Sequence, residues 1–278
     1  FIDVFVASGM GGLNLPVNLT FTPQQQVSVT PSANSTPTAD AGGPYVINEG
    51  DLLNLVGGAS SDPDLDTLTY AWDLDNDSIY GEIGEPVTES PTVSWATLVG
   101  FGIGNDGSFT IGLQVDDGNG SIDTTTTTLT VNNVAPTITS SFTLVVAENT
   151  TFVQTVTASD PADPVTFTVN GGADQALFAI DATTGVLTFK TAPDFDAPTD
   201  ADSNNVYEVQ VSADDGDGGI DVELLSVTLT GVNDNTPVIT SGNTQLIDEN
   251  QTVVHMLTAT DDDLPAQTIT FSIAGSGT

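Results

Sequence analysis

The chain has 278 residues and carries 38 Asp and Glu against a single Lys or Arg, so its formal net charge is −37. Because no basic patch is available to meet phosphate, this charge excludes nucleic acid and anionic membrane surfaces as partners. One basic residue also cannot balance the acids internally, which predicts that small dissolved cations neutralise the acidic clusters.

Other bulk features limit the fold class. No apolar run approaches the roughly 18 residues of a transmembrane helix, and Phe1 does not begin a charged and then apolar leader, so we expect no membrane insertion and no signal peptide in this segment. Cysteine is absent, so no disulfide can hold the fold together. At about 100 to 200 residues per domain, the length predicts two or three domains.

An internal repeat sets the domain boundaries. "PTITSSFTLVVAENTTFVQTVTASD" begins at Pro136, and "PVITSGNTQLIDENQTVVHMLTATD" begins at Pro237, with five positions matching at an offset of 101. A looser copy starts at Pro37, which lies 99 residues before Pro136. Asn-rich turns followed by Pro separate the copies, so the sequence predicts modules of about 100 residues joined by short linkers.

The first part of the chain predicts an incomplete module. Residues 1–36 contain "LPVNLTFT" and "QVSVTP", which alternate like strands and end in turn residues. We interpret them as the C-terminal part of a preceding β module.

Residues 37–135 predict a complete β module with a candidate metal loop. Its marks are "GGASSDPD", "LTYAWDLDND" and "GSFTIGLQVDDGNG", and the run Thr124–Thr128 is expected to be an exposed edge or face strand. Asp73, Asp75 and Asp77 are spaced two apart, which brings carboxylates toward one ion if the loop is tight. Position 84 is Gly and not Glu, so this is not an EF-hand, although Glu82 or Glu85 could complete the shell. The alternative is a loop that is merely solvated.

Residues 136–236 predict an antiparallel β-sandwich. Short runs rich in Val, Thr and Phe are separated by Gly, Asn, Asp and Pro, and no segment has a helical period. The expected strands are "FTLVV", "TFVQTVTA", "VTFTV", "GVLTFK", "VYEVQVSA" and "LLSVTLTGV".

Residues 237–278 repeat only the opening motifs of that module. Half a sandwich exposes a sheet edge and part of its core. We therefore expect either a fragment of a longer protein or completion of this half-module by another chain.

Two family resemblances follow from these motifs. Residues 136–236 resemble a bacterial cadherin-like repeat through "AEN", "ASD", "FAIDATTGVLTF", "PDFDAP", "YEVQVSADDG" and "VNDNTP", and residues 237–278 resemble the first half of a second one. Residues 37–135 resemble a polycystic kidney disease (PKD) repeat, with Trp72 as the core tryptophan. The resemblances imply an all-β fold of tandem Greek-key, immunoglobulin-like β-sandwiches joined by short linkers.

The cadherin-like resemblance also implies Ca²⁺ at the module junctions. Such an ion takes about six to eight oxygen ligands, and a chain with no Cys and one His offers little to zinc. Gly231 stands where the family has Asp, and Asp196 stands where it has Glu, which puts a full set of three ions in question. The implied ligands are Glu148, Asp194, Asp196, Asn233, Asp234, Asp261 and Asp263 at the junction after residue 236, and Asp160, Asp163 and Asp215, in altered form, at the junction before residue 136. Asp200 and Asp202 are expected to be solvated.

These inferences predict a calcium-stiffened structural or adhesive region of a secreted, bacterial surface protein. It would be a stalk, fibre or adhesin shaft whose partners are neighbouring modules, copies of the same chain, or surface glycans and proteins. One alternative is a self-assembling filament or surface-layer subunit with half-modules completed between chains. Another is a carbohydrate-binding accessory region of a secreted hydrolase. We expect no enzyme activity, because the only histidine, His255, lies in a strand pattern with no assignable catalytic partners.

Overall fold

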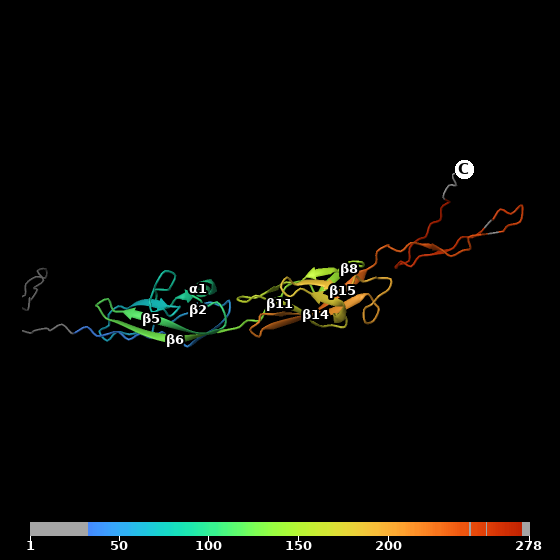
Figure 1. The fold of residues 1–278 in the computed structure, drawn as a ribbon. Helices are drawn as coiled ribbons and strands as arrows, with labels where there is room; N and C mark the ends of the chain where they lie inside the picture. Colours follow the sequence, from blue (N-terminus) through green and yellow to red (C-terminus); the bar gives the residue numbers. More distant parts are fainter. Residues whose placement is uncertain (1–32, 245, 254, 274–278) are drawn as a thin grey trace, which may run out of the picture.

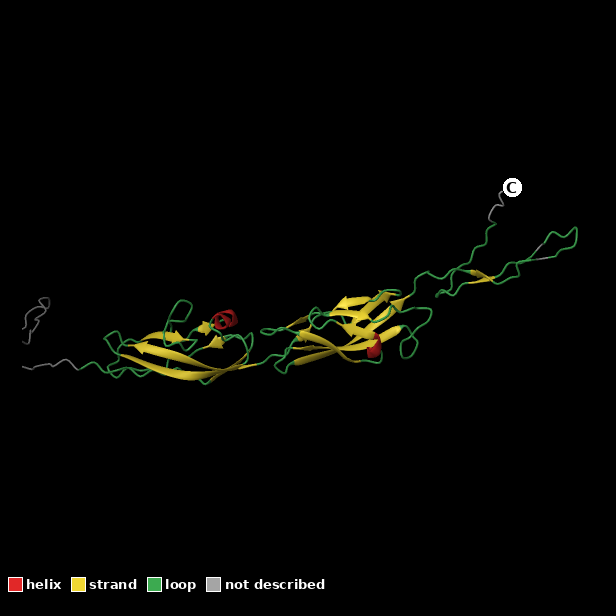
Figure 2. Cartoon of the chain, in the orientation of Figure 1, coloured by secondary structure: helices red, strands yellow, loops and turns green. Residues whose placement is uncertain are grey.

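The computed structural model describes residues 33–244, 246–253 and 255–273, and in this part of the chain two β-sandwiches follow one another end to end (Figure 1). Strands dominate both sandwiches (Figure 2), which confirms the all-β fold class. We call residues 37–135 the first module, residues 136–236 the second module, and residues 237–273 the C-terminal segment. The predicted strands in residues 1–32 lie outside the described residues.

The first module contains a four-stranded sheet with the order β1-β6-β5-β3 and a small sheet of β2 and β4. β5 and β6 form a long antiparallel hairpin, while β1 pairs in parallel with the end of β6, which brings the C-terminal ends of β1 and β6 together at the linker. The elements are β1 (Tyr45–Asn48), β2 (Leu53–Asn54), β3 (Thr69–Asp73), β4 (Thr92–Val93), α1 (Trp95–Gly100), β5 (Gly107–Asp116) and β6 (Ile122–Asn132).

Trp72 lies at the centre of the first module's core. It is fully buried, and its indole Nε1 donates to the carbonyl of Thr88 at 2.9 Å. A buried indole needs such a partner, and this bond ties β3 to the segment that precedes β4. Trp72 is therefore the core tryptophan that the sequence predicts.

The Thr124–Thr128 run lies within β6, as predicted, with exposed and half-buried residues alternating along the strand. The short helix α1 was not predicted. Ser94 caps it by accepting from the backbone N–H of Thr97 at 3.2 Å, and one turn is too short to produce a helical period in the sequence.

The second module consists of two main sheets and one short strand pair. The main sheets have the orders β11-β14-β15-β8 and β12-β13-β9, and β7 pairs with β10. Here too the strand near the module's start, β8, pairs in parallel with the last strand, β15. The elements are β7 (Thr137–Ile138), β8 (Thr143–Ala147), β9 (Phe152–Thr155), β10 (Ala158–Ser159), β11 (Thr166–Gly171), the 3₁₀ turn η1 (Gln175–Leu177), β12 (Phe178–Ile180), β13 (Val186–Phe189), β14 (Val206–Asp214) and β15 (Ile220–Thr230).

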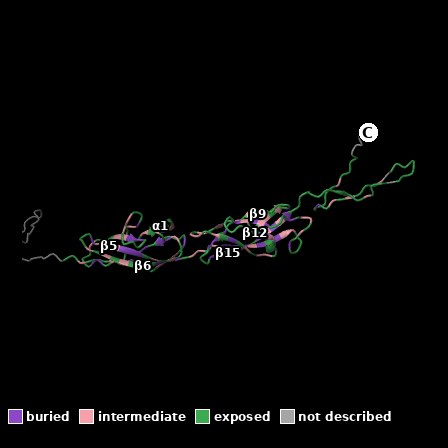
Figure 3. Ribbon diagram, in the orientation of Figure 1, coloured by how far each residue is buried: buried purple, intermediate pink, exposed green. Residues whose placement is uncertain are grey.

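Aromatic rings fill the second module's core. The ring of Tyr207 meets the ring of Phe189 edge-on at a centroid distance of 5.1 Å, and Phe178 lies 4.5 Å from Phe189. Inward and outward residues alternate along β15, because successive side chains of a strand point to opposite faces. Each module thus has its own core (Figure 3).

The C-terminal segment forms one short ladder among its described residues, β16 (Val238–Ile239) with β17 (Ala259–Thr260). Its apolar side chains stay exposed, for example Val253, Met256 and Phe271. Among the described residues of the whole chain, no helix has the length and apolarity needed to cross a membrane.

Candidate metal centres

Glu49 lies at the junction of the first and second modules. Its backbone N–H donates to the carbonyl of Asn132 at 3.1 Å, which continues the parallel pairing of β1 with β6. The side chain is 3% exposed, and its Oε2 accepts from the N–H of Val134 in the linker at 3.0 Å. The side chain of Glu49 therefore extends from the first module toward the linker and the second module.

Two aspartates of the second module meet Glu49 there. Glu49, Asp160 and Asp163 each offer a carboxylate oxygen, and the three oxygens lie within 4.8 Å of one another. We call this group the first joint. Glu49 Oε1, Asp160 Oδ2 and Asp163 Oδ2 are all buried without a hydrogen-bond partner. Since such oxygens are costly to bury, and the three carboxylates converge, a divalent cation fits the group.

The electrostatics of the first joint agree with this fit. Burial raises the pKa of Asp163 to about 6, and the charges of Glu49, Asp217, Asp160 and Asp215 add to the rise. A carboxylate that is hard to ionise beside other carboxylates is one that a bound cation would stabilise.

Asp215, which the sequence assigns to the same junction, has a different setting. Its Oδ1 accepts from the backbone N–H groups of Asp217 and Gly219, each at 2.9 Å, and its Oδ2 accepts from Asn133 Nδ2 at 3.0 Å. Burial raises its pKa, but these hydrogen bonds outweigh burial and leave the pKa lowered. Asp215 holds the linker to the second module and adds negative charge near Asp163.

Glu148 occupies the matching place at the end of the second module. It is 2% exposed, and its backbone N–H donates to the carbonyl of Thr230 at 3.0 Å, as Glu49 does to Asn132. Its Oε1 accepts from the N–H of Val232 and its Oε2 from the N–H of Phe195, both at 2.6 Å. Glu49 and Glu148 thus make equivalent hydrogen bonds to the last strand and to the linker of their own module.

Asp194 and Asp196 join Glu148, with one carboxylate oxygen from each residue within 4.8 Å of the others. We call this group the second joint. Asp196 reaches the C-terminal segment, because its Oδ1 accepts from the N–H of Leu264 at 2.7 Å. Its Oδ2 accepts from Asn235 Nδ2 in the linker at 2.9 Å. Asp196 therefore links the second module, the linker and the C-terminal segment.

Asp263 contributes from the far side of the second joint. It is 1% exposed, and its Oδ1 accepts from the N–H groups of Asp234 and Asn235 at 3.2 and 2.9 Å, while its Oδ2 is buried without a partner. The hydrogen bond from Asn235 is the main reason that its pKa is lowered. Asp261 accepts from the N–H of Asp263 at 3.1 Å.

The two linker residues predicted as ligands bind neighbouring amides. Asp234 Oδ2 accepts from Asn149 Nδ2 at 2.5 Å, and Asn233 Nδ2 donates to Gln267 Oε1. Both contacts cross from the linker to a neighbouring part of the chain. They hold the second joint together and keep these side chains beside the acidic group.

The unexpected glycine of the linker has a steric reason. A Cβ at Gly231 would lie 2.5 Å from the carbonyl oxygen of Leu264 and 3.1 Å from the ring of Phe195. An Asp at this position has no room while the C-terminal segment lies where it does. Gly231 therefore offers no carboxylate, but it lets the linker backbone approach the backbone of the C-terminal segment closely.

The loop between Asp73 and Glu85 carries the acids predicted inside the first module. It contains two overlapping groups, each with oxygens within 4.8 Å, which are Asp73, Asp75 and Glu85, and Asp75, Asp77 and Glu82. The sequence left Glu82 and Glu85 as alternatives, whereas the structure places one in each group.

Two acidic features were not assigned from the sequence. Glu49 was recognised only as part of the repeat, although its place 99 residues before Glu148 could have identified it as a ligand. A further group of Asp62, Asp64 and Asp66 also lies within 4.8 Å. Asp62 Oδ1 accepts from the backbone N–H groups of the other two, so hydrogen bonds within the turn hold this group.

The expectation that Asp200 is solvated is wrong. Asp200 is 5% exposed and accepts from the N–H groups of Asn204 and Asn205 at 2.7 and 3.3 Å. It shapes the loop before β14, a role that chain position alone does not distinguish from solvation. Asp202 is exposed, as expected, and accepts from Asn204 Nδ2 at 2.8 Å.

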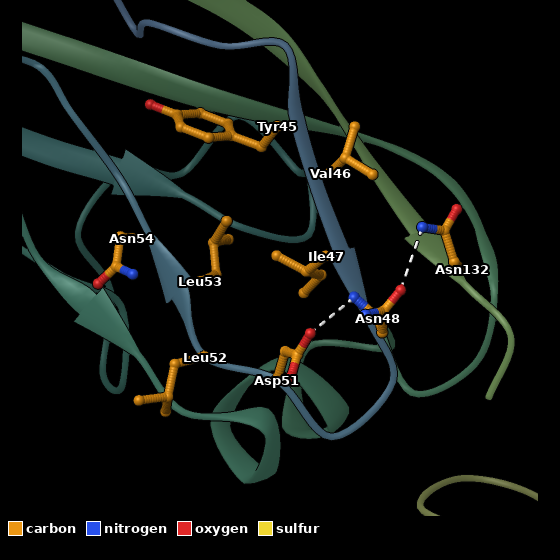
Figure 4. A pocket seen from close by; sticks show the side chains of 9 residues that line it. All are labelled: Tyr45, Val46, Ile47, Asn48, Asp51, Leu52, Leu53, Asn54 and Asn132. Carbon is orange, nitrogen blue, oxygen red and sulfur yellow. Dashed lines mark hydrogen bonds between the residues drawn. The ribbon is translucent and has the colours of Figure 1, made fainter.

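A hollow of about 640 Å³ lies beside β1 and β2 (Figure 4). Its polar groups already bind one another, since Asp51 Oδ2 accepts from the N–H of Asn48 at 3.1 Å and Asn132 Nδ2 donates to Asn48 Oδ1 at 3.2 Å. It therefore offers a ligand few free polar groups. Its lining residues are Tyr45, Val46, Ile47, Asn48, Asp51, Leu52, Leu53, Asn54 and Asn132.

Comparison with known proteins supports both resemblances. The PKD domain family model matches residues 34–131. A stretch of 107 residues is 33% identical to Cadherin-related family member 2 of Mus musculus, which is 38% of this chain and 8% of the mouse protein. The chain therefore spans only a small part of that relative's length.

Several solved cadherin structures are also similar to the chain. Drosophila N-cadherin EC1-4 is 21% identical with a TM-score of 0.41, covering 82% of this chain and 60% of that one. Mouse Cadherin-23 EC22-24 is 19% identical with a TM-score of 0.39, covering 83% and 78%. Human CDH23 EC21-23 is 17% identical with a TM-score of 0.44, covering 82% and 81%. At these identities the similarity concerns the fold alone.

Proposed function

From a chain that joins a PKD-like repeat to cadherin-like repeats, we propose a calcium-stiffened extracellular region of a multi-domain surface protein, with a structural or adhesive role. The observation that carries the proposal is the recurrence of a buried glutamate at the linker end of each module, close to aspartates of the same or the next module. A linker that only connects two domains does not require a group of acidic side chains at each junction.

The mechanism is electrostatic and uses this chain's own carboxylates. Glu49 reaches across the first joint to Asp160 and Asp163, and Asp196 reaches across the second joint to the N–H of Leu264. Calcium would supply positive charge shared by oxygens of adjoining modules, which fixes the angle between them. Without a cation, the carboxylates repel one another, and the linkers are free to bend.

The donor set favours calcium over other metals. The two joints offer carboxylate oxygens, the chain has no cysteine, and its only histidine is His255. Hard oxygen donors of this kind suit Ca²⁺, whereas structural zinc sites use thiolate and imidazole.

Small-angle scattering with calcium and with chelator tests the proposal. We expect the maximum dimension of the full chain to fall and its flexibility to rise when Ca²⁺ is removed. Asp196→Asn should reproduce the bent state at the second joint even in calcium. Asp202→Asn is the matched control, because Asp202 lies on the same loop, is exposed and accepts a hydrogen bond from Asn204 of that loop. An unchanged scattering profile on chelation would refute calcium stiffening.

A filament subunit is the second candidate. It is favoured by the exposed apolar side chains of the C-terminal segment, such as Val253 and Phe271, which a complementary segment of another copy could cover. Its proposed complement, residues 1–36, lies almost entirely outside the described residues. Electron micrographs of the full chain in calcium would separate single rods from ordered polymers.

A further inference from the structure

The loop from Asp73 to Glu85, which we call the Asp73 loop, concentrates negative charge in the body of the first module. It follows β3 directly, so it begins beside the core tryptophan Trp72. Its five acids are Asp73, Asp75, Asp77, Glu82 and Glu85. Joint stiffening makes no use of them, because they belong to one module.

The innermost acid of the loop has an oxygen without a partner. Asp73 is 1% exposed, and its Oδ2 accepts from the N–H of Ser78 at 2.9 Å. Its Oδ1 is buried and has no hydrogen-bond partner. Asp75 and Glu85 each place a carboxylate oxygen within 4.8 Å of this residue's ligand oxygen. A positive charge between the three carboxylates would offset the cost of burying the unpartnered oxygen of Asp73.

The backbone prevents these carboxylates from moving apart. Glu85 is 8% exposed and accepts from the N–H groups of Leu74, Gly81 and Glu82 at 2.5, 3.0 and 3.3 Å. Gly81 also donates its N–H to the carbonyl of Trp72 at 2.8 Å, although one N–H shared in this way binds each acceptor less strongly. The loop is therefore folded back onto β3, and Glu85 is held near Asp73. Its carboxylate oxygens keep lone pairs that can still bind a cation.

A second group surrounds the outer part of the loop. Asp77 and Glu82 lie within 4.8 Å of Asp75, which belongs to both groups. Burial raises the pKa of Glu82, and the charges of Asp77, Asp75 and Asp73 raise it further. Burial also raises the pKa of Glu85 more than its N–H partners lower it.

We propose that the Asp73 loop binds Ca²⁺ through Asp73, Asp75 and Glu85, inside the first module and independently of the joints. Asp77 and Glu82 surround Asp75 and increase the affinity through their charge. All the side-chain donors are carboxylates, which suits a hard divalent cation. The ion clamps the loop to β3 and so stabilises the first module around Trp72.

Tryptophan-sensitised terbium luminescence of the full chain tests this site selectively. Both tryptophans, Trp72 and Trp95, lie in the first module, and Trp72 is adjacent to Asp73. Tb³⁺ takes the place of Ca²⁺, and energy transfer from the indole reports a bound ion only at short range. We expect saturable emission that Ca²⁺ displaces, and a rise in the first module's melting temperature in calcium, followed by tryptophan fluorescence.

The variants separate the two groups of acids. Asp75→Asn changes an exposed residue shared by both groups and should weaken Tb³⁺ binding by about tenfold or more, because a charged ligand is lost. Asp77→Asn should weaken binding by only a few-fold, on the order of threefold, since it removes nearby charge. Asp106→Asn, at an exposed loop acid elsewhere in the module, is the matched control and should bind as the wild type does.

Three results would overturn the site: no indole-sensitised emission, emission that Ca²⁺ does not displace, or unchanged binding by Asp75→Asn. Failure of joint stiffening looks different, because chelation and Asp196→Asn would then leave the scattering profile unchanged while the indole-sensitised emission remained saturable and displaced by Ca²⁺. Asp75→Asn is the main test because Asp75 is exposed, whereas a substitution of the buried Asp73 could prevent folding.

Discussion

Replacing Asp163 by Asn tests the first joint most directly, because the expected effect is stabilising in chelator and largely cancelled in calcium. In chelator the carboxylate of Asp163 is repelled by Glu49 and Asp160, so its removal should stabilise the protein. In calcium the same carboxylate is a ligand, so its removal should reduce the stabilisation that the ion provides. A purely structural role for Asp163 would change stability by the same amount under both conditions.

The magnitude follows from the geometry. Two unit charges 4.8 Å apart, the separation limit of the joint, repel by about 3.5 kcal/mol at an effective dielectric of 20. The rise in the pKa of Asp163 from 3.8 to about 6 corresponds to about 3 kcal/mol. Because Asp163 is only partly buried, solvent screening reduces this to about 1 to 2 kcal/mol.

Differential scanning calorimetry of the full chain measures the effect. At about 4 to 8 °C per kcal/mol for a domain of this size, Asp163→Asn should melt about 5 to 10 °C higher than the wild type in chelator. At a calcium concentration about 100-fold above the dissociation constant, binding stabilises the wild type by about 2.7 kcal/mol. A tenfold weaker variant loses about 1.4 kcal/mol of that gain. An equal melting shift in chelator and in calcium would refute the reasoning.

Three further predictions concern pH, the linker and the core. The pKa of Asp163 is raised to about 6. Protonated Asp163 therefore stabilises the calcium-free protein fully below pH of about 4, and this stabilisation is lost as pH rises through about 6. Calorimetry in chelator should show a lower melting temperature at pH 7 than at pH 4.5, and Asp163→Asn should lack this part of the pH dependence. Gly231→Ala should bend the second joint, because its Cβ would meet the Leu264 carbonyl at 2.5 Å, and scattering in calcium would reveal it; an unchanged profile contradicts the close approach. Leu225→Ala, at a fully buried core position, should cost about 2 to 5 kcal/mol in denaturant unfolding, whereas Leu224→Ala at its exposed neighbour should cost little.

Local patterns were enough to predict most of the strands. The alternation in "VYEVQVSA" and "LLSVTLTGV" places β14 and β15 correctly, because a strand of a sandwich buries every second side chain. The helix α1 was missed, since a single turn capped by Ser94 has no period to detect. The repeat of about 100 residues likewise marks where modules follow one another.

The acidic sites divide in the same way. The spacing of Asp73, Asp75 and Asp77 is local, so the sequence could predict that the loop gathers carboxylates. The buried state of Asp200 is not local, because it depends on the backbone N–H groups that the folded loop presents to it. Sequence position treats Asp200 and Asp202 alike, and only the fold separates them.

Strand alternation, repeat length and net charge are properties of the chain, so they are enough to identify a series of acidic β modules without internal counter-charges. Which acids meet depends on how the strands pair in space. Glu49 joins Asp160 and Asp163 across more than 100 residues because β1 pairs in parallel with the end of β6 and delivers the glutamate to the linker. Oxygens that bind one ion must lie within a few ångströms in space, and that distance is set by strand pairing and not by spacing along the chain.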